Sequence, residues 1–305
     1  MKKILLATDG SSCAEEAAWL LSHLPHDRQL QIYVLTVLQI PYGHQRYLSA
    51  TAVSETVDRE RKAGRQAFEK VSDLFQGADV RLHHVTREGH RGQAIVETAE
   101  ELNVDLTVVG ARGHSTVRRL LLGSTSDYVA THTRTSVLVV RPTGLRQENR
   151  PIQIAMGYEE SEAATFALQE LSQTKWGRQS DIHVVSVVSY VSAFLNELIV
   201  EVDEIREAAR QSVGAAADRL RQVAPHTTSH LIECDHVGEG LINFVEENGS
   251  DLMVVGETPH NALGRIVLGS VSRFALRHAP CSVWISRDSS SLGSKHEAAL
   301  EATFQ

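Results

Sequence analysis

Short runs of apolar and β-branched residues alternate with stretches of helical periodicity along the first half of the chain. Consecutive or alternating apolar residues predict strands, and apolar residues three and four positions apart predict helices. The pattern predicts strands at residues 3–8, 31–37, 80–85, 106–109 and 137–140. It predicts helices at residues 13–24, 54–75, 93–102 and 124–131. Strands that alternate with helices are typical of an α/β fold with a buried parallel sheet.

The second half of the chain repeats the first at a shift of 146 positions. Residues 92–141 align with residues 238–287, and 18 of these 50 positions are identical. A repeat of this length is a whole domain, not one unit of a solenoid. The strand pattern recurs at residues 153–156, 182–188, 229–232, 252–255 and 283–285. We predict domains at 1–141 and 152–287, a linker at 142–151 and a tail at 288–305.

Composition is that of an ordinary globular protein. Hydrophobic residues make up 42% of the 305 positions and charged residues 22%, which leaves enough apolar material for a core in each domain. No run approaches the roughly 20 apolar residues of a membrane span, and the apolar start is too short for a signal peptide. The three cysteines lack the spacing of a zinc or redox site. We therefore expect a cytoplasmic protein in a reducing compartment.

The net charge of −8 is unevenly distributed along the chain. Residues 1–141 hold 17 basic and 16 acidic side chains, whereas residues 142–305 hold 13 basic and 22 acidic ones. Nucleic acids and anionic membrane surfaces are bound mainly through Lys and Arg, so we expect neither as a partner. The asymmetry has two interpretations, solubility or a first half that alone binds an anion.

A group of glycines follows the fourth predicted strand of the first half. Gly110 and Gly113 are separated by two residues, and Gly113 and Gly123 by nine, with Gly123-Ser124 at the start of a predicted helix. Glycines let a backbone approach a ligand closely, and the N–H groups at a helix N-terminus bind anions. This placement favours a phosphate site. The alternative is a plain strand-to-helix loop that Ser124 caps.

The motif resembles the nucleotide signature of the universal stress protein family, G-x-x-G, nine residues, then G-[ST], and the resemblance covers both repeats. It implies two tandem Rossmann-like open parallel sheets with strand order 3-2-1-4-5 and helices on both faces. It also implies a role in the stress response and the binding of ATP as a cofactor. The nucleotide-binding positions that it assigns are Ala7, Asp9, Val37, Val109, Gly110, Gly113, Gly123, Ser124 and Thr125.

The resemblance also divides these positions among the parts of the nucleotide. Ribose would lie near Asp9 and Gly110, adenine at the Val37 backbone, and the phosphates at the later glycines and hydroxyls. The implied strand order makes strands one and four neighbours at the switch point where open α/β sheets bind ligands. For Asp9 alone, the alternative is an N-cap of the following helix.

Charged side chains and a metal ion enter only as secondary expectations. The cationic residues between Gly110 and Gly123 either offset triphosphate charge or are simply solvated; they are Arg112, His114, Arg118 and Arg119. Ser124 could assist a Mg²⁺ ion, but no acidic cluster marks a dedicated metal cage, and the histidines lack metal-ligand spacing. We therefore assign no metal-binding residue.

The second copy departs from the motif. Pro259 replaces the middle glycine and we place Gly157 at the aspartate position, although Gly269 and Ser270 remain. Proline removes a backbone donor, and Glu257 puts a carboxylate beside the expected phosphate path. We predict weak or absent ATP binding in this copy. The alternative is that Pro259 only reshapes the loop and the nucleotide still binds.

Three functional hypotheses remain. No Gly-Lys pair, metalloprotease, hydrolase or kinase signature occurs, so we assign no catalytic residue. The leading hypothesis is a nucleotide-dependent regulatory protein whose surface or association state changes with ATP. The second is a slow ATPase in which Ser124 and His114 assist water attack. The third is a nucleotide-independent scaffold that pairs through its last strands, between the two domains or in a homo-oligomer such as a dimer.

Overall fold

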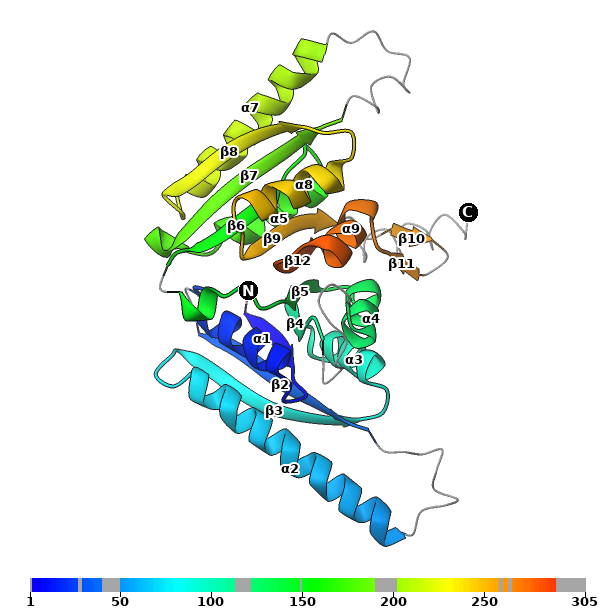
Figure 1. Ribbon diagram of the computed structural model, residues 1–305. Coiled ribbons are helices and arrows are strands. Elements are labelled where there is room, and N and C mark those ends of the chain that lie inside the picture. Colours follow the sequence, from blue (N-terminus) through cyan, green and yellow to red (C-terminus); the bar gives the residue numbers. More distant parts are fainter. Residues whose placement is uncertain are drawn as a thin grey trace, which may run out of the picture. The chain divides into compact units, whose positions relative to one another are not determined.

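The computed structural model describes residues 2–26, 29–39, 50–112, 122–148, 150–189, 202–257, 260–262 and 265–288. The chain divides into two compact units. The first comprises Met1–Thr133 with Val137–Pro142, and the second comprises Arg134–Ser136 with Thr143–Gln305. Each unit combines parallel strands with helices, which confirms the predicted α/β class (Figure 1). No described helix is long and apolar enough to cross a membrane.

The first five strands lie in the order β3-β2-β1-β4-β5. Their bounds are β1 Lys3–Ala7, β2 Leu30–Leu38, β3 Val80–Glu88, β4 Leu106–Gly110 and β5 Ser136–Val140. The helices between them are α1 Ser12–His23, α2 Ala50–Leu74, α3 Arg91–Leu102 and α4 Ser124–His132. Helix α1 packs beside α2, and α3 packs beside α4. Right-handed crossovers place these two pairs on opposite faces of the sheet, because the strand order reverses after β3.

The second run of five strands has the same connectivity, in the order β12-β9-β6-β7-β8. Its strands are β6 Ile152–Gly157, β7 Ser180–Val188, β8 His226–Glu233, β9 Leu252–Glu257 and β12 Ser282–Arg287. Its helices are α5 Glu162–Ser172, α7 Val202–Arg221, α8 Val237–Glu247 and α9 Ser270–His278. Short 3₁₀ turns occupy Leu145–Gln147 and Gly177–Gln179. The implied strand order is thus present within each run of five strands.

One pair of strands was not predicted. Strands β10 (His260–Ala262) and β11 (Arg265–Val267) pair antiparallel between β9 and α9. Their three-residue length gives too little periodicity for a sequence pattern to detect. The corresponding segment of the first unit, residues 113–121, lies outside the described residues.

Burial follows the position of each strand in the sheet. Strand β4 is buried at all five positions, whereas β3, at the edge, is partly exposed along its whole length. A central strand between two helical layers has both faces covered, and an edge strand does not. The predicted strand at residues 31–37 is buried as expected for a parallel sheet, since Ile32, Val34 and Leu35 are each 0% exposed.

Two histidines of the second unit lie against a phenylalanine. His183 Nδ1 is 3.2 Å from His230 Nε2, and both rings contact Phe244. Burial lowers the pKa of His183, the nearby His230 lowers it further, and Asp181 opposes the shift. Burial also lowers the pKa of His230. The described residues hold no group of three or more His, Cys, Asp and Glu side chains able to bind a metal.

We expect this histidine pair to make stability depend on pH. A buried histidine with a lowered pKa binds fewer protons than its unfolded form, so its contribution is present above about pH 6.5 and is lost as pH falls through the folded pKa. The Tm should therefore fall between pH 7.5 and pH 5.5. The fall should be smaller in His183→Gln, which removes one titrating ring. Equal falls in the two proteins, measured by circular dichroism, would contradict this explanation.

Candidate functional site

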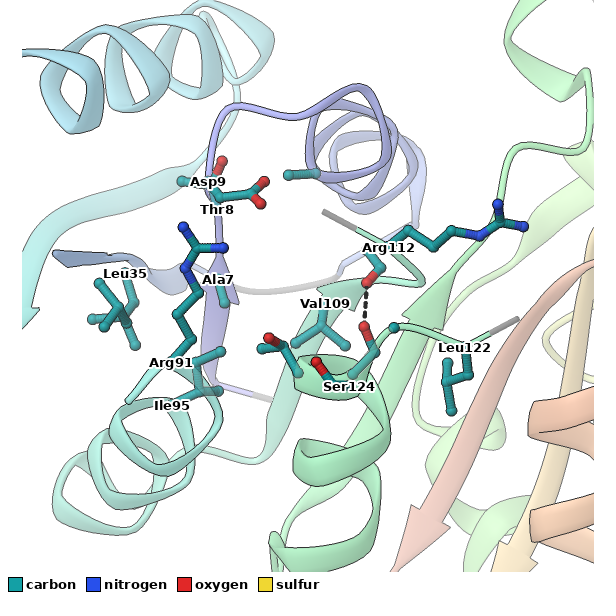
Figure 2. Close-up of a pocket in the computed structure, with 16 residues that line it drawn as sticks. Ala7, Thr8, Asp9, Leu35, Arg91, Ile95, Val109, Arg112, Leu122 and Ser124 are labelled. Carbon is teal, nitrogen blue, oxygen red and sulfur yellow. Dashed lines mark hydrogen bonds between the residues drawn. The ribbon is translucent and has the colours of Figure 1, made fainter. Parts of the chain in front are cut away.

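A cavity of about 460 Å³ opens where β1 and β4 end in the first unit (Figure 2). These strands are neighbours, with Ile4 opposite Leu106, at the point where the strand order reverses. Open α/β sheets bind ligands at such a switch point. The cavity is lined by eight of the nine predicted positions, namely Ala7, Asp9, Val37, Val109, Gly110, Gly123, Ser124 and Thr125. The ninth, Gly113, lies outside the described residues.

Asp9 lies just beyond the end of β1. The Thr8 N–H donates to the Leu35 carbonyl at 2.9 Å, which holds the chain beside β2 up to this point. Asp9 Oδ1 then accepts the Ser11 N–H at 3.0 Å. Ser11 is the N-cap of α1, and its Oγ accepts the Ala14 N–H at 3.3 Å. Ser11 therefore caps the helix, and the alternative interpretation of Asp9 as the N-cap was wrong.

Gly110 lets α1 approach the end of β4. A Cβ at this position would lie 2.7 Å from the carbonyl carbon and the oxygen of Cys13. Both are backbone atoms, so the clash could be relieved only by moving the helix. Because α1 also carries the chain away from Asp9, this contact fixes the distance between the two strand ends that line the cavity.

The first turn of α4 forms the other side of the cavity. Gly123 is its N-cap, and the Gly123 N–H donates to the Ala111 carbonyl at 2.8 Å. Ser126 Oγ donates to the Gly110 carbonyl at 2.7 Å, which ties this turn to β4. The N–H groups that follow, starting at Ser124, have no partner within the helix. Together with the helix dipole they favour an anion in the cavity.

Two arginines line the cavity and differ in direction. Arg91 Nε is buried and has no hydrogen-bond partner among the described residues. Figure 2 shows the Arg91 side chain leaving α3 with its guanidinium directed toward Thr8 and Asp9, whereas the Arg112 guanidinium is directed away from them. The role of Arg112 as a phosphate contact stays a prediction. The other cationic residues between Gly110 and Gly123, namely His114, Arg118 and Arg119, lie outside the described residues.

Sequence reasoning missed part of the lining. The additional residues are Thr8, Ala14, Leu35, Arg91, Ile95, Leu122 and Ser126. Leu35 precedes Val37 by two positions on β2, so strand alternation could have placed both side chains on one face. Arg91 and Ile95 are four positions apart on one face of α3. Periodicity alone does not reveal that this face covers the cavity, because that depends on the strand order.

Strand register corrects one assignment in the second copy. Leu6 pairs with Val108, and Met156 pairs with Val254 in the same way. The Tyr158 N–H donates to the Val185 carbonyl, in the same way as the Thr8 N–H donates to the Leu35 carbonyl. Counting on by one residue, the counterpart of Asp9 is Glu159. The placement of Gly157 at the aspartate position was therefore wrong, since that residue corresponds to Ala7.

The second unit is closely packed at its counterpart of the cavity. A Cβ at Gly240 of α8 would lie 2.9 Å from Val187 Cγ1, and Val187 corresponds to Val37. A Cβ at Gly157 would lie 3.1 Å from Leu241 Cδ1. Small residues at both positions let α8 and the strands approach each other. Pro259, the predicted obstruction, lies outside the described residues.

The model of the universal stress protein family matches residues 1–141 and 150–287. The chain belongs to this family. A universal stress protein of Methanocaldococcus jannaschii is 32% identical over 142 residues, which are 46% of this chain and 82% of that protein. One from Bacillus subtilis is 26% identical over 150 residues, which are 46% of this chain and 98% of that protein. This chain is therefore a tandem universal stress protein, with one copy in each half.

The same fold occurs over most of the chain in a solved structure. The crystal structure of a universal stress protein from Archaeoglobus fulgidus covers 93% of this chain and 98% of that one, at 18% identity and a TM-score of 0.62. At this identity the likeness concerns the fold alone.

Proposed function

We propose that the first unit of this universal stress protein binds an adenine nucleotide, ATP, in the cavity between β1, β4, α3 and α4. The observation that carries the proposal is the convergence of Asp9, Gly110 and the first turn of α4 on one cavity. The protein then acts as a nucleotide-dependent regulator in the stress response. Partners would read the loaded state of the first unit, and the proposal requires no catalytic residue.

The lining is divided in a way that suits a nucleotide. The phosphates would lie at the N-terminus of α4, where Gly123, Ser124 and Thr125 line the cavity and the N–H groups of a helix start can bind an anion. Asp9 would accept hydrogen bonds from the ribose hydroxyls. The base would lie on the apolar side formed by Leu35, Val37 and Ile95. A cavity of about 460 Å³ is within the usual range for small-molecule ligands.

We further propose one nucleotide per chain. Supporting this is the tight packing at the counterpart of the base side, where a Cβ at Gly240 or Gly157 would lie within 3.1 Å of Val187 or Leu241. The Glu257 carboxylate also accepts the Gly269 N–H, at the counterpart of the phosphate side. The slow-ATPase hypothesis stays a prediction, since it depends on His114, which lies outside the described residues. The scaffold hypothesis also stays a prediction.

Calorimetric titration of the full chain with ATP tests the proposal. We expect micromolar affinity, about −8 kcal/mol, at one site per chain. Neither GTP nor CTP should compete well if the base side selects adenine. A chain stripped of copurified nucleotide that releases no heat with ATP, ADP or AMP would contradict adenine-nucleotide binding.

Arg91 should contribute to that affinity. Its buried Nε needs an acceptor, and a bound nucleotide offers one. We expect Arg91→Met to weaken ATP binding by at least about tenfold, because a hydrogen bond from a charged donor is worth about 1.5–3 kcal/mol. Methionine keeps the apolar stem of the side chain, so the cavity wall stays in place.

Arg112→Met is the matched control for this prediction. Both arginines line the cavity, but the Arg112 guanidinium is directed away from Thr8 and Asp9 (Figure 2). Its replacement should therefore change the affinity less than the replacement of Arg91. Titrations in which Arg112→Met has the larger effect, or Arg91→Met has none, would exclude this role of Arg91.

A further inference from the structure

The N-terminus of α9 in the second unit faces a carboxylate of its own chain. Glu257, the last residue of β9, accepts the Gly269 N–H through Oε1 at 2.7 Å. Gly269 is the N-cap of α9, as Gly123 is of α4. In the first unit the Gly123 N–H instead donates to the backbone carbonyl of Ala111, the residue that corresponds to Glu257. The second unit thus has a carboxylate where the first unit has only a methyl group.

Arg287 holds the other oxygen of this carboxylate. Its Nη2 donates to Glu257 Oε2 at 3.0 Å, and the two residues are register partners on β12 and β9. The side chains are 0% and 2% exposed. A buried carboxylate is costly unless it is paired and hydrogen-bonded. The guanidinium on one oxygen and the helix N-terminus on the other meet this requirement.

We propose that the Glu257 carboxylate permanently fills the anion position of the second unit, where it replaces the ligand phosphate that the first unit binds at α4. This inference rests on the proposed function, which assigns the N-terminus of α4 to a phosphate. The second unit is then complete without a nucleotide. It is a ligand-independent copy of the fold, and only the first unit responds to nucleotide concentration.

Anion rescue of a full-length Glu257→Ala variant tests the proposal. Truncation removes the carboxylate from the Arg287 guanidinium and the Gly269 N–H and opens a space of about carboxylate size. We expect the Tm to fall by roughly 5–15 °C. Formate, in place of chloride at equal ionic strength, should enter this space and restore about half of the loss. The natural chain should show no comparable difference between these salts.

Glu257→Gln is the matched control. It keeps an acceptor for the Gly269 N–H and the side-chain volume, but it removes the charge and leaves no room for an anion. Its Tm should fall, and formate should not raise it. If Glu257→Ala does not fold, this variant still decides, because a Tm equal to that of the natural chain would show that the charge is not needed.

Two results would overturn the proposal. One is a Glu257→Ala Tm that responds to formate no more than the natural chain does. The other is an unchanged Tm in Glu257→Gln. Neither measurement involves the cavity of the first unit, so a failure of ATP to bind there would appear separately, in the titration.

Discussion

Replacing Gly256 with alanine should lower the Tm of the second unit by about 10 °C, since backbone overpacking of this kind costs roughly 3 kcal/mol or more. A Cβ at this position would lie 2.2 Å from the Ala163 carbonyl oxygen and 2.4 Å from its carbon. These are backbone atoms in the first turn of α5, so the helix itself would have to move off β9. The loss should be visible in thermal unfolding followed by circular dichroism.

Gly214→Ala is the control for this variant. Gly214 lies within α7, and a Cβ there would have no neighbour within 4 Å among the described residues, apart from the backbone of its own helix. Alanine is a better helix former than glycine, so this change should raise stability by about 0.5–1 kcal/mol. The two glycine-to-alanine changes are expected to have opposite signs. A Gly256→Ala protein that unfolds within about 2 °C of the natural chain would contradict the packing of α5 on β9.

Gly123→Val should abolish measurable ATP binding, with a loss of at least about a hundredfold, or roughly 2.7 kcal/mol. Gly123 lines the cavity at the N-terminus of α4, and its φ of −68° is accessible to valine, so the helix should still form. The Cβ would lie 3.2 Å from the Ala111 carbonyl oxygen, and the two methyl groups would extend from it at the position proposed for the phosphates.

Gly269→Val places the same change at the same position of the second copy. Gly269 has φ −60°, and a Cβ there would have Glu257 Oε1 at 3.9 Å as its one neighbour within 4 Å among the described residues. We expect the ATP affinity of this variant to equal that of the natural chain. Equal losses in the two valine variants would mean that both copies bind the nucleotide, or that the loss at Gly123 has a cause other than the cavity.

Most of the elements could be predicted from periodicity because the buried parallel strands are apolar at nearly every position. The prediction for β4, residues 106–109, differs from the observed Leu106–Gly110 by one residue. The positions in the glycine motif could be predicted for a similar reason. Gly110 and Gly123 each have a backbone neighbour within 3.2 Å of where a Cβ would lie. Close approach of backbones restricts the residue type, and such restrictions are visible in a sequence.

The rest of the site depends on which distant segments of the chain the fold brings together, and one sequence does not reveal this. Arg91 lies on α3, far in sequence from Asp9 and Ser124, and only the strand order brings α3 to the cavity. The wrong assignment of Gly157 arose because the two copies differ in length between their first and third helices. The helix caps Ser11 and Ser161 are 150 positions apart, whereas Gly92 and Gly238 are 146 apart, so the alignment shifts by four residues between them.

The uneven charge of the two halves is compatible with both interpretations. The sequence left open whether the acidic second half served solubility or reflected an anion site confined to the first half. Glu257 is an acidic residue buried at the position that corresponds to the proposed phosphate site, where the first unit has Ala111. Glu257 is paired with Arg287, so this pair carries no net charge. The exposed acidic side chains of α7, such as Glu204 and Glu207, suit the solubility interpretation, and both interpretations stay predictions.

The most direct test of the central claim is the amount of nucleotide bound per chain. The natural protein, Gly123→Val and Gly269→Val would each be saturated with ATP, freed of unbound ligand and denatured, and the released nucleotide would be counted by chromatography. We predict about one adenine nucleotide per chain from the natural protein and from Gly269→Val, and none from Gly123→Val. Two nucleotides per chain, or one that persists in Gly123→Val, would contradict a single site in the first unit.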